Sequence, residues 1–182
     1  MVSSSIDKII HFWFMESKPE QWFKKDEAYD SLIAERFSSL HGMAASCELY
    51  GWRDKALGRL AEIIILDQFS RNIYRDTPNA FACDSLALSL SQEALRTGAS
   101  KSLGPQQRAF FYMPFMHSES SSIHEVAVEL FSEPGMENNL EFELRHKEII
   151  DRFGRYPHRN DILGRESTPE EIEFLETPGS SF

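Results

Sequence analysis

The stretch Arg59–Phe81, RLAEIIILDQFSRNIYRDTPNAF, most constrains the fold, because it begins almost wholly apolar and ends in a dense polar cluster. Its apolar residues point in nearly every direction around a helix, which is typical of a helix buried on most sides. The isoleucine-rich run Ile63–Leu66 alone also suits a buried strand. The apolar pattern continues at helical spacing over a length that no typical strand has. We therefore expect a central helix over about residues 54–72.

Four polar residues end this helix, and they form two pairs at a spacing of four, Asp67 with Arg71 and Gln68 with Asn72. Residues four apart share one face of a helix. An unpaired charge on a buried helix is costly, so these side chains need partners. Two interpretations remain open: a structural ion pair that joins the helix to its neighbours, or the floor of a ligand pocket.

Length and charge limit the class of protein. The chain has 182 residues, which suits one helical domain over residues 1–175, with 176–182 as a frayed tail. It carries 19 basic and 29 acidic side chains, a formal net charge of −10. This charge argues against general nucleic-acid binding and against anionic membrane surfaces. We therefore expect no nucleic-acid partner and no membrane partner.

The cysteines and the N-terminal residues predict a compartment. Cys47 and Cys83 are too few and too scattered for a disulfide framework or a zinc ribbon, so each is expected to be a small buried apolar residue. No signal-peptide pattern opens the chain, and Ile9–Met15 is too short to span a bilayer. These features predict a cytoplasmic protein.

The remaining chain also has the pattern of helices. No segment alternates in the manner of a strand, and the connections are short. Thr168-Pro169-Glu170-Glu171 carries a strong signal for a helix start. Apolar spacing and capping residues predict helices, besides the central one, over about residues 6–14, 24–45, 79–96, 106–116, 123–131, 138–153 and 169–175. The predicted fold class is all-α, with about eight helices.

A histidine and a carboxylate follow a proline in the helix predicted at 106–116. Pro114 predicts a kink or an early end of that helix, just before His117-Ser118-Glu119. His117 and Glu119 can act as a general base with its orienting group, whereas Ser118 and Glu119 can instead cap the next helix. No metal-binding spacing accompanies them, so no metal site is predicted.

Basic residues gather in Arg145–Arg165, which holds six Lys and Arg against three acids in a strongly acidic chain. The planar fork of arginine suits carboxylate and phosphate groups. Alternatively, these cations complement a helix C-terminus and pair with surface acids, which accounts for Arg152 and Arg155. It accounts less well for Pro157–Asn160, whose tight loop holds its side chains in fixed directions.

Three stretches together, Leu66–Phe81, Tyr112–Glu119 and Arg152–Glu171, resemble an uncharacterised bacterial family of TPR-like, all-helical proteins of the "domain of unknown function" type. The resemblance covers nearly the whole chain. It implies a single domain of the α-α superhelix class and no particular activity. Ser70 stands where that family usually shows proline, and serine leaves the helix free to continue. The residues that match the family's motifs are Asp67, Gln68, Arg71, Asn72, Arg108, His117, Glu119, Arg155, His158, Arg159 and Asn160.

Two main functional hypotheses follow. In the first, Arg71, Arg108, Arg155 and Arg159 bind a small anionic molecule beside Asp67, Gln68, Asn72 and Asn160. His117, Glu119 and His158 are then the candidate catalytic residues, because histidine titrates near neutral pH. In the second, stacked helices bind a peptide or protein, and the polar cluster is structural. A third, less favoured hypothesis is a structural protein that forms homo-oligomers. No phosphate-binding glycine loop or nucleophile motif is present, so the reaction, the cofactor and the oligomeric state stay open.

Overall fold

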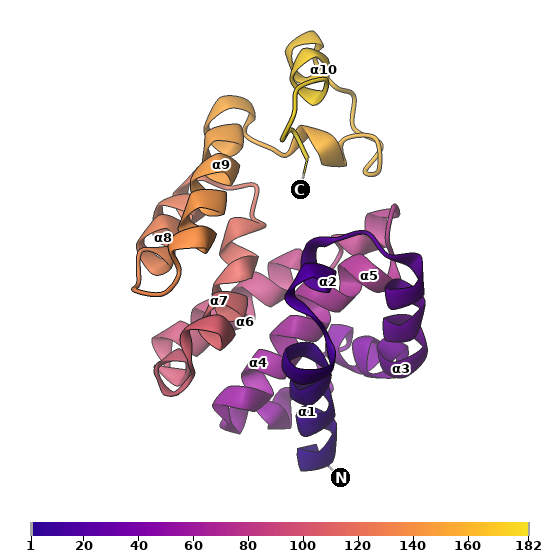
Figure 1. The fold of residues 1–182 in the computed structure, drawn as a ribbon, viewed down its shortest axis with the longest axis vertical. Helices are drawn as coiled ribbons and strands as arrows, with labels where there is room; N and C mark the ends of the chain where they lie inside the picture. Colours follow the sequence, from indigo (N-terminus) through magenta and orange to yellow (C-terminus); the bar gives the residue numbers. More distant parts are fainter. Residues whose placement is uncertain (1, 182) are drawn as a thin grey trace.

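The structure, a computed structural model, describes residues 2–181, with side chains from residue 5 onward (Figure 1). This part of the chain is helical and contains no strand, which confirms the predicted all-α class. Whether the helices repeat as TPR-like pairs stays a prediction. The helices are α1 Val2–His11, α2 Pro19–Phe23, α3 Glu27–Ala45, α4 Ala56–Ile64, α5 Ser70–Ile73, α6 Asp84–Arg96, α7 Pro105–Met116, α8 Ser121–Phe131, α9 Glu137–Phe153 and α10 Pro169–Leu175.

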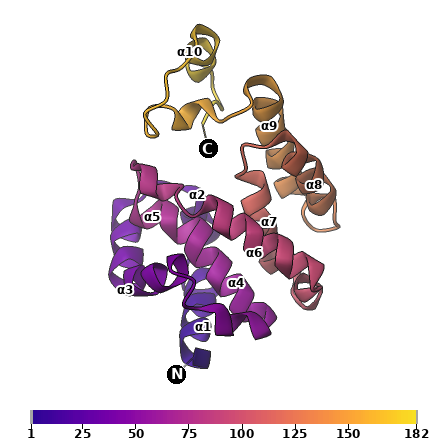
Figure 2. The same ribbon diagram turned by 180° about the vertical axis from the view of Figure 1, so that it is seen from behind.

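The expected central helix is present. α4 passes through a π-helical turn, Ile65–Phe69, directly into α5, so helical backbone continues from Ala56 to Ile73. Ile63, Ile64, Ile65 and Leu66 lie in this helix and not in a strand, and all are buried. Helices α1, α3, α6 and α7 contact it, and Figure 2 shows it among them. A helix surrounded in this way needs an apolar surface on most sides, as its sequence has.

Aromatic side chains fill the core around the central helix. Phe37 of α3 stacks on Phe69 with ring centroids 4.9 Å apart, and Trp13 meets Phe110 of α7 at 5.5 Å. Aromatic pairs at such separations add to the stabilisation from apolar burial alone. The core thus joins the N-terminal helices, the central helix and α7 into one unit.

Two helix starts differ from the sequence-based expectation. The helix expected at 24–45 begins only at Glu27, because Asp26 adopts an extended conformation and its carboxylate accepts hydrogen bonds from the N–H groups of Ala28 and Tyr29. This N-cap begins α3 and separates it from α2. The helix expected at 79–96 begins only at Asp84, after a short 3₁₀ turn at Pro78–Ala80.

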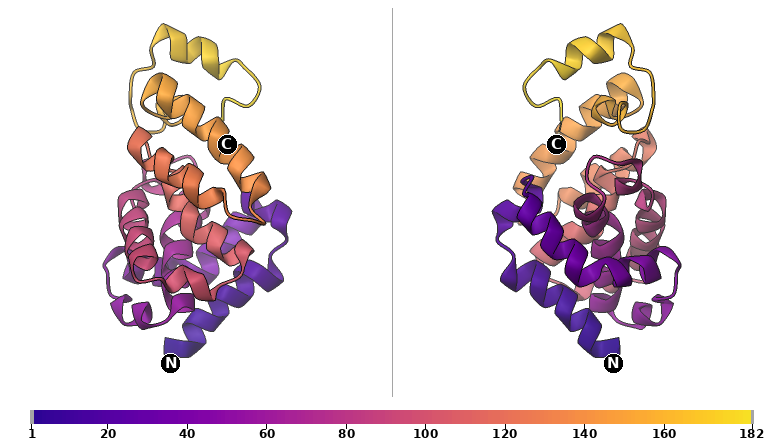
Figure 3. Two further views of the ribbon diagram at one scale, coloured as in Figure 1. Left: turned by 90° about the vertical axis from the view of Figure 1, so that its left-hand side faces the viewer. Right: turned by 90° about the vertical axis from the view of Figure 1, so that its right-hand side faces the viewer.

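The C-terminal third extends away from the N-terminal helices. α8 packs against both α7 and α9, and α10 lies beyond α9, at the opposite end of the molecule from the start of α1 (Figure 3). α10 has the predicted capping box, in which Thr168 and Glu171 exchange side-chain and backbone hydrogen bonds. A small apolar cluster of Ile149, Ile150 and Tyr156 anchors this end.

Three smaller features complete the fold. Cys47 is exposed and has φ 59°, and Cys83 is half-buried, so the expectation of two buried cysteines is wrong for Cys47. Ser180 is buried and its hydroxyl donates to the carbonyl of Leu175, while the domain limit at 175 and the frayed tail stay predictions. Within residues 2–181, no helix has the length and apolar character needed to cross a membrane.

Candidate functional site

The site begins where the central helix meets the end of α7. Asp67 lies in the π-helical turn, and His117 is the C-cap residue that directly follows α7. Their side chains are in hydrogen-bond contact, with Asp67 Oδ1 2.7 Å from His117 Nδ1. The two residues are far apart in the sequence, and they come together because α7 packs along α4. Extra π-helical turns of this kind are often found at functional sites.

The charges around Asp67 settle how this pair is protonated. Burial alone raises the pKa of Asp67, but the charges of His117 and Arg71 outweigh burial and hold the pKa below its usual range. Burial and the Arg71 charge lower the pKa of His117. Arg71, 3.3 Å from Asp67 Oδ1, keeps the carboxylate ionised even when His117 is neutral. At neutral pH, His117 Nδ1 therefore donates to Asp67, and Nε2 carries the lone pair.

A second carboxylate, Asp84, is shared between two arginines. Arg71 donates to it through both Nη atoms, at 3.0 Å each, and also donates to the backbone carbonyl of Asp67. Arg159 makes a longer contact of 3.3 Å with the same carboxylate and donates to the carbonyl of His117 at 3.1 Å. Arg71 thus makes three hydrogen bonds inside the protein, whereas Arg159 makes the longer contact with Asp84.

Arg159 is buried, and not all of its N–H groups have hydrogen-bond partners in the part of the chain that the structure describes. Its residue is 6% exposed, and its Nε atom has no hydrogen-bond partner among the described residues. The rings of Phe81 and Tyr156 both lie against its guanidinium, with Cζ 4.6 Å from each ring centroid. Burial and the nearby Arg71 charge lower the pKa of Arg159. An incompletely compensated buried cation is costly, so an added anion next to it is stabilising.

A pocket of about 300 Å³ opens beside these groups. Its volume is at the lower end of the range of small-molecule sites, and its lining includes both apolar and polar residues. His117 Nε2 makes no hydrogen bond with the described part of the chain, and His117 lies in the pocket wall. The lining residues are Pro78, Phe81, Ala82, Asp84, Ser85, Leu88, Pro114, His117, Ser118, Glu119, Arg159 and Leu163.

Glu119 lines the pocket and also holds the loop that carries Arg159. Its carboxylate receives both Nη atoms of Arg165, at 2.6 and 2.9 Å, and the backbone N–H of Tyr156 at 2.8 Å. Burial raises the pKa of Glu119, but these hydrogen bonds and the Arg165 charge lower it by more, so its pKa is below the usual value. Glu119 is therefore ionised and engaged, and its contacts fix the loop against the end of α7.

Three of the four arginines predicted to bind the ligand, Arg71, Arg108 and Arg155, are not among the residues that line this pocket. Arg108 donates to Glu133 at 2.9 Å and to the carbonyl of Leu103 at 2.9 Å. Arg155 forms a two-bond pair with Glu171, at 2.7 Å for both bonds. Arg108 and Arg155 are thus each paired with an acid outside the pocket lining. The structure therefore brings Arg71 and Arg159 together but not all four arginines.

The remaining predicted residues support the site from behind or lie apart from it. Gln68 donates to Asp67 Oδ2 at 2.5 Å, and Asn72 donates to Asp30 at 2.7 Å. Asn160 is fully buried and accepts from Arg165 inside the C-terminal loop. His158 lies in the same loop, where burial, followed by the Arg159 charge, lowers its pKa to about 4. These four residues do not line the pocket.

Sequence reasoning missed three partners in the site: Asp84, Phe81 and Tyr156. One feature of the sequence indicated a structural role for Asp84. It lies in the first turn of a helix, where an acid interacts favourably with the helix dipole. Its pairing with two arginines depends on the tertiary contacts of α6 and was not readable from spacing. The aromatic contacts to Arg159 have the same origin.

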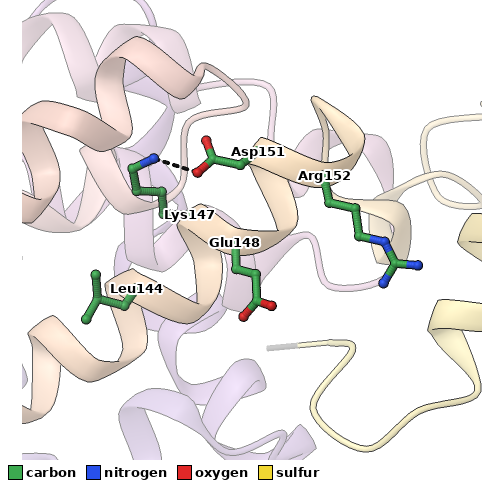
Figure 4. Close-up of a pocket in the computed structure, with 5 residues that line it drawn as sticks. All are labelled: Leu144, Lys147, Glu148, Asp151 and Arg152. Atoms are coloured by element: carbon green, nitrogen blue, oxygen red, sulfur yellow. Dashed lines mark hydrogen bonds and ion pairs between the residues drawn. The ribbon is translucent and has the colours of Figure 1, made fainter.

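A larger and shallower depression of about 540 Å³ lies on the outer side of α9 (Figure 4). All of its lining residues come from that one helix, and Lys147 pairs with Asp151 at 2.6 Å. A binding site usually has polar groups that converge from several elements, and this depression has none from outside α9. Among residues 2–181, no group of three or more His, Cys, Asp or Glu side chains is arranged to hold a metal ion.

Comparisons with known proteins place the chain in a family. A family model described as a bacterial protein of unknown function (DUF924) matches residues 9–179. A solved structure of a protein of unknown function from Agrobacterium tumefaciens is 40% identical, covers 97% of this chain and 99% of its own, and superposes with a TM-score of 0.92. Comparison with curated proteins finds no match. The chain therefore belongs to the bacterial family of unknown function DUF924.

Proposed function

We propose that the pocket binds a small molecule with an anionic group and that His117 exchanges a proton with it. The observation that carries the proposal is the 2.7 Å bond between His117 Nδ1 and an ionised Asp67, which leaves Nε2 as a lone pair at the pocket wall. A carboxylate on the far nitrogen orients the imidazole and stabilises the imidazolium that forms when Nε2 takes a proton.

The anionic group is assigned to Arg159. Asp84 is divided between two guanidinium groups, and Arg71 takes the shorter bonds. A guanidinium carries more N–H donors than the two bonds that Arg159 makes. A carboxylate or phosphate at its pocket edge supplies the missing acceptor and charge. The apolar lining residues, which include Phe81, Leu88 and Leu163, then receive the carbon skeleton of the ligand.

A thermal-shift screen with small carboxylates and phosphates at neutral pH tests this proposal. A ligand that binds only the folded state raises the melting temperature in proportion to ln(1 + [L]/Kd). We expect a hit with wild type that is lost in Arg159→Gln and weakened in His117→Gln. Arg108→Gln is the matched control, because Arg108 is paired with Glu133 away from the pocket, and it keeps the shift.

Two results contradict the proposal: no acid shifts wild type, or Arg159→Gln and wild type shift equally. Isothermal titration on each folded variant separates lost binding from lost stability. The alternative function, a scaffold that binds a peptide or protein, predicts no response to small acids and no dependence on Arg159. A cytoplasmic setting belongs to the proposal, because the free thiols of Cys47 and Cys83 suit a reducing compartment.

A further inference from the structure

The turn that carries His117 is held by side chains at three successive carbonyl groups. The hydroxyl of Tyr156 donates to the carbonyl of Met116 at 2.5 Å, and Arg159 donates to that of His117 at 3.1 Å. His124 Nε2 lies 2.8 Å from the carbonyl of Ser118. The last carbonyls of a helix lack partners within the helix and most often face water. Here α8 and the C-terminal loop supply all three donors.

The proton position on His124 follows from its surroundings. Nε2 faces a carbonyl, which only accepts, so Nε2 carries a proton. Nδ1 lies 2.6 Å from Glu143 Oε1, and both residues are fully buried. One further proton lies between Nδ1 and Oε1, which leaves the buried pair without net charge. Glu143 thereby fixes the ring orientation of His124, and His124 fixes the carbonyl of Ser118.

Contacts along its backbone, ring and hydroxyl group hold Tyr156 in place. Its backbone N–H donates to Glu119, its ring packs in the apolar cluster with Ile149 and Ile150, and its hydroxyl oxygen lies 3.2 Å from His124 Nε2. The ring is fully buried. A rigid donor of this kind restricts the turn at Met116–Ser118 more than a water molecule does.

We propose that Tyr156 and the His124–Glu143 pair are positioning residues for His117. By holding the carbonyls of Met116 and Ser118, they keep His117 Nδ1 on Asp67 and Nε2 at the pocket. Groups that orient a catalytic or ligating histidine from behind are needed for its function although they touch no ligand. The inference rests on the proposed function only in treating His117 as the group that exchanges a proton.

The side-chain ¹⁵N spectrum of His117 tests the inference without any ligand. It reports which ring nitrogen carries the proton. We expect Nδ1–H alone in wild type, and a mixture with Nε2–H in Tyr156→Phe and in His124→Gln. Tyr156→Phe removes one hydroxyl and keeps the ring, so the fold is retained. His41→Gln is the matched control: His41 is also buried and bonded, to Ser70 Oγ at 2.8 Å, but it does not contact this turn. We expect His41→Gln to leave the tautomer of His117 unchanged.

An Asp67→Leu variant, which removes the acceptor of His117 Nδ1–H and keeps a similar volume, separates this inference from the proposed function. A change of tautomer in Asp67→Leu but not in Tyr156→Phe or His124→Gln overturns the positioning role and leaves the Asp67–His117 pair intact. An equal change in His41→Gln also overturns it, because a general loosening of the fold then accounts for the effect. No change of tautomer in Asp67→Leu contradicts the pair itself, and both proposals fail together.

Discussion

At the scale of single residues, the shared carboxylate of Asp84 organises the charges of the site. It accepts from Arg71 and Arg159, which otherwise lie close together with no acid between them. Asp67 balances the other side of Arg71. Two cations and two anions therefore neutralise one another, and burial together with the Arg71 charge lowers the pKa of His117, which favours its neutral form.

Asp84→Asn removes this charge and keeps the shape of the side chain. The two arginines then repel each other in a partly buried setting, and we expect the free energy of unfolding to fall by about 3 kcal/mol. Urea denaturation measures the change. The control is Glu93→Gln, which breaks an exposed pair with Arg96 and leaves stability nearly unchanged. Similar stability for the two variants is inconsistent with the role given to Asp84.

The sequence predicted the chemistry of these residues better than their partners. Asp67, Arg71, His117 and Arg159 were all candidates, and the structure places them together. Arg108 looked equivalent to Arg159 in the sequence. It lies elsewhere because an arginine pairs with whichever acid the packed helices bring near it, and no spacing rule encodes that choice.

At the scale of helices, the apolar pattern located most of the elements because burial determines them. The central helix, α7, α9 and the capped α10 lie close to their expected limits. The pattern did not show the π-helical turn at Ile65–Phe69, since one extra residue in a helical turn leaves the spacing almost unaltered. Ser70 lies in this continuation, and its hydroxyl donates to the carbonyl of Leu66 at 2.6 Å.

Two glycines give opposite predictions at this scale. A Cβ atom on Gly58 of α4 meets the backbone oxygen of Trp52 at 2.1 Å, whereas one on Gly42 of α3 meets no heavy atom within 4 Å. Gly58→Ala forces α4 away from its neighbour and is expected to cost about 3 kcal/mol. Gly42→Ala gains helix propensity and is expected to stabilise by about 0.5–1 kcal/mol. Denaturation curves of the two variants that shift in the same direction contradict this packing.

At the scale of the whole molecule, buried histidines make the stability depend on pH. Burial lowers the pKa of His146 to about 3 and, together with the Arg159 charge, that of His158 to about 4. In the unfolded chain these groups take up protons near pH 6.5. Between about pH 6.5 and 4 the unfolded state therefore binds more protons, and stability falls as the pH falls.

The expected slope is about 1.4 kcal/mol per pH unit for each histidine. Urea denaturation at pH 7, 6 and 5 is therefore expected to give decreasing stability. His146→Gln flattens the slope. Constant stability over this range is the result that contradicts buried neutral histidines.

The central claim concerns the whole chain: distant stretches meet so that His117 faces a pocket that binds an anion through Arg159. The most direct measurement is the side-chain ¹⁵N spectrum of His117 and Arg159 during titration with the small acids of the screen. The account predicts that His117 Nε2 and Arg159 Nε move together and saturate with one Kd, while His41 stays constant. An acid that binds without moving these signals, or no binding acid at all, contradicts it.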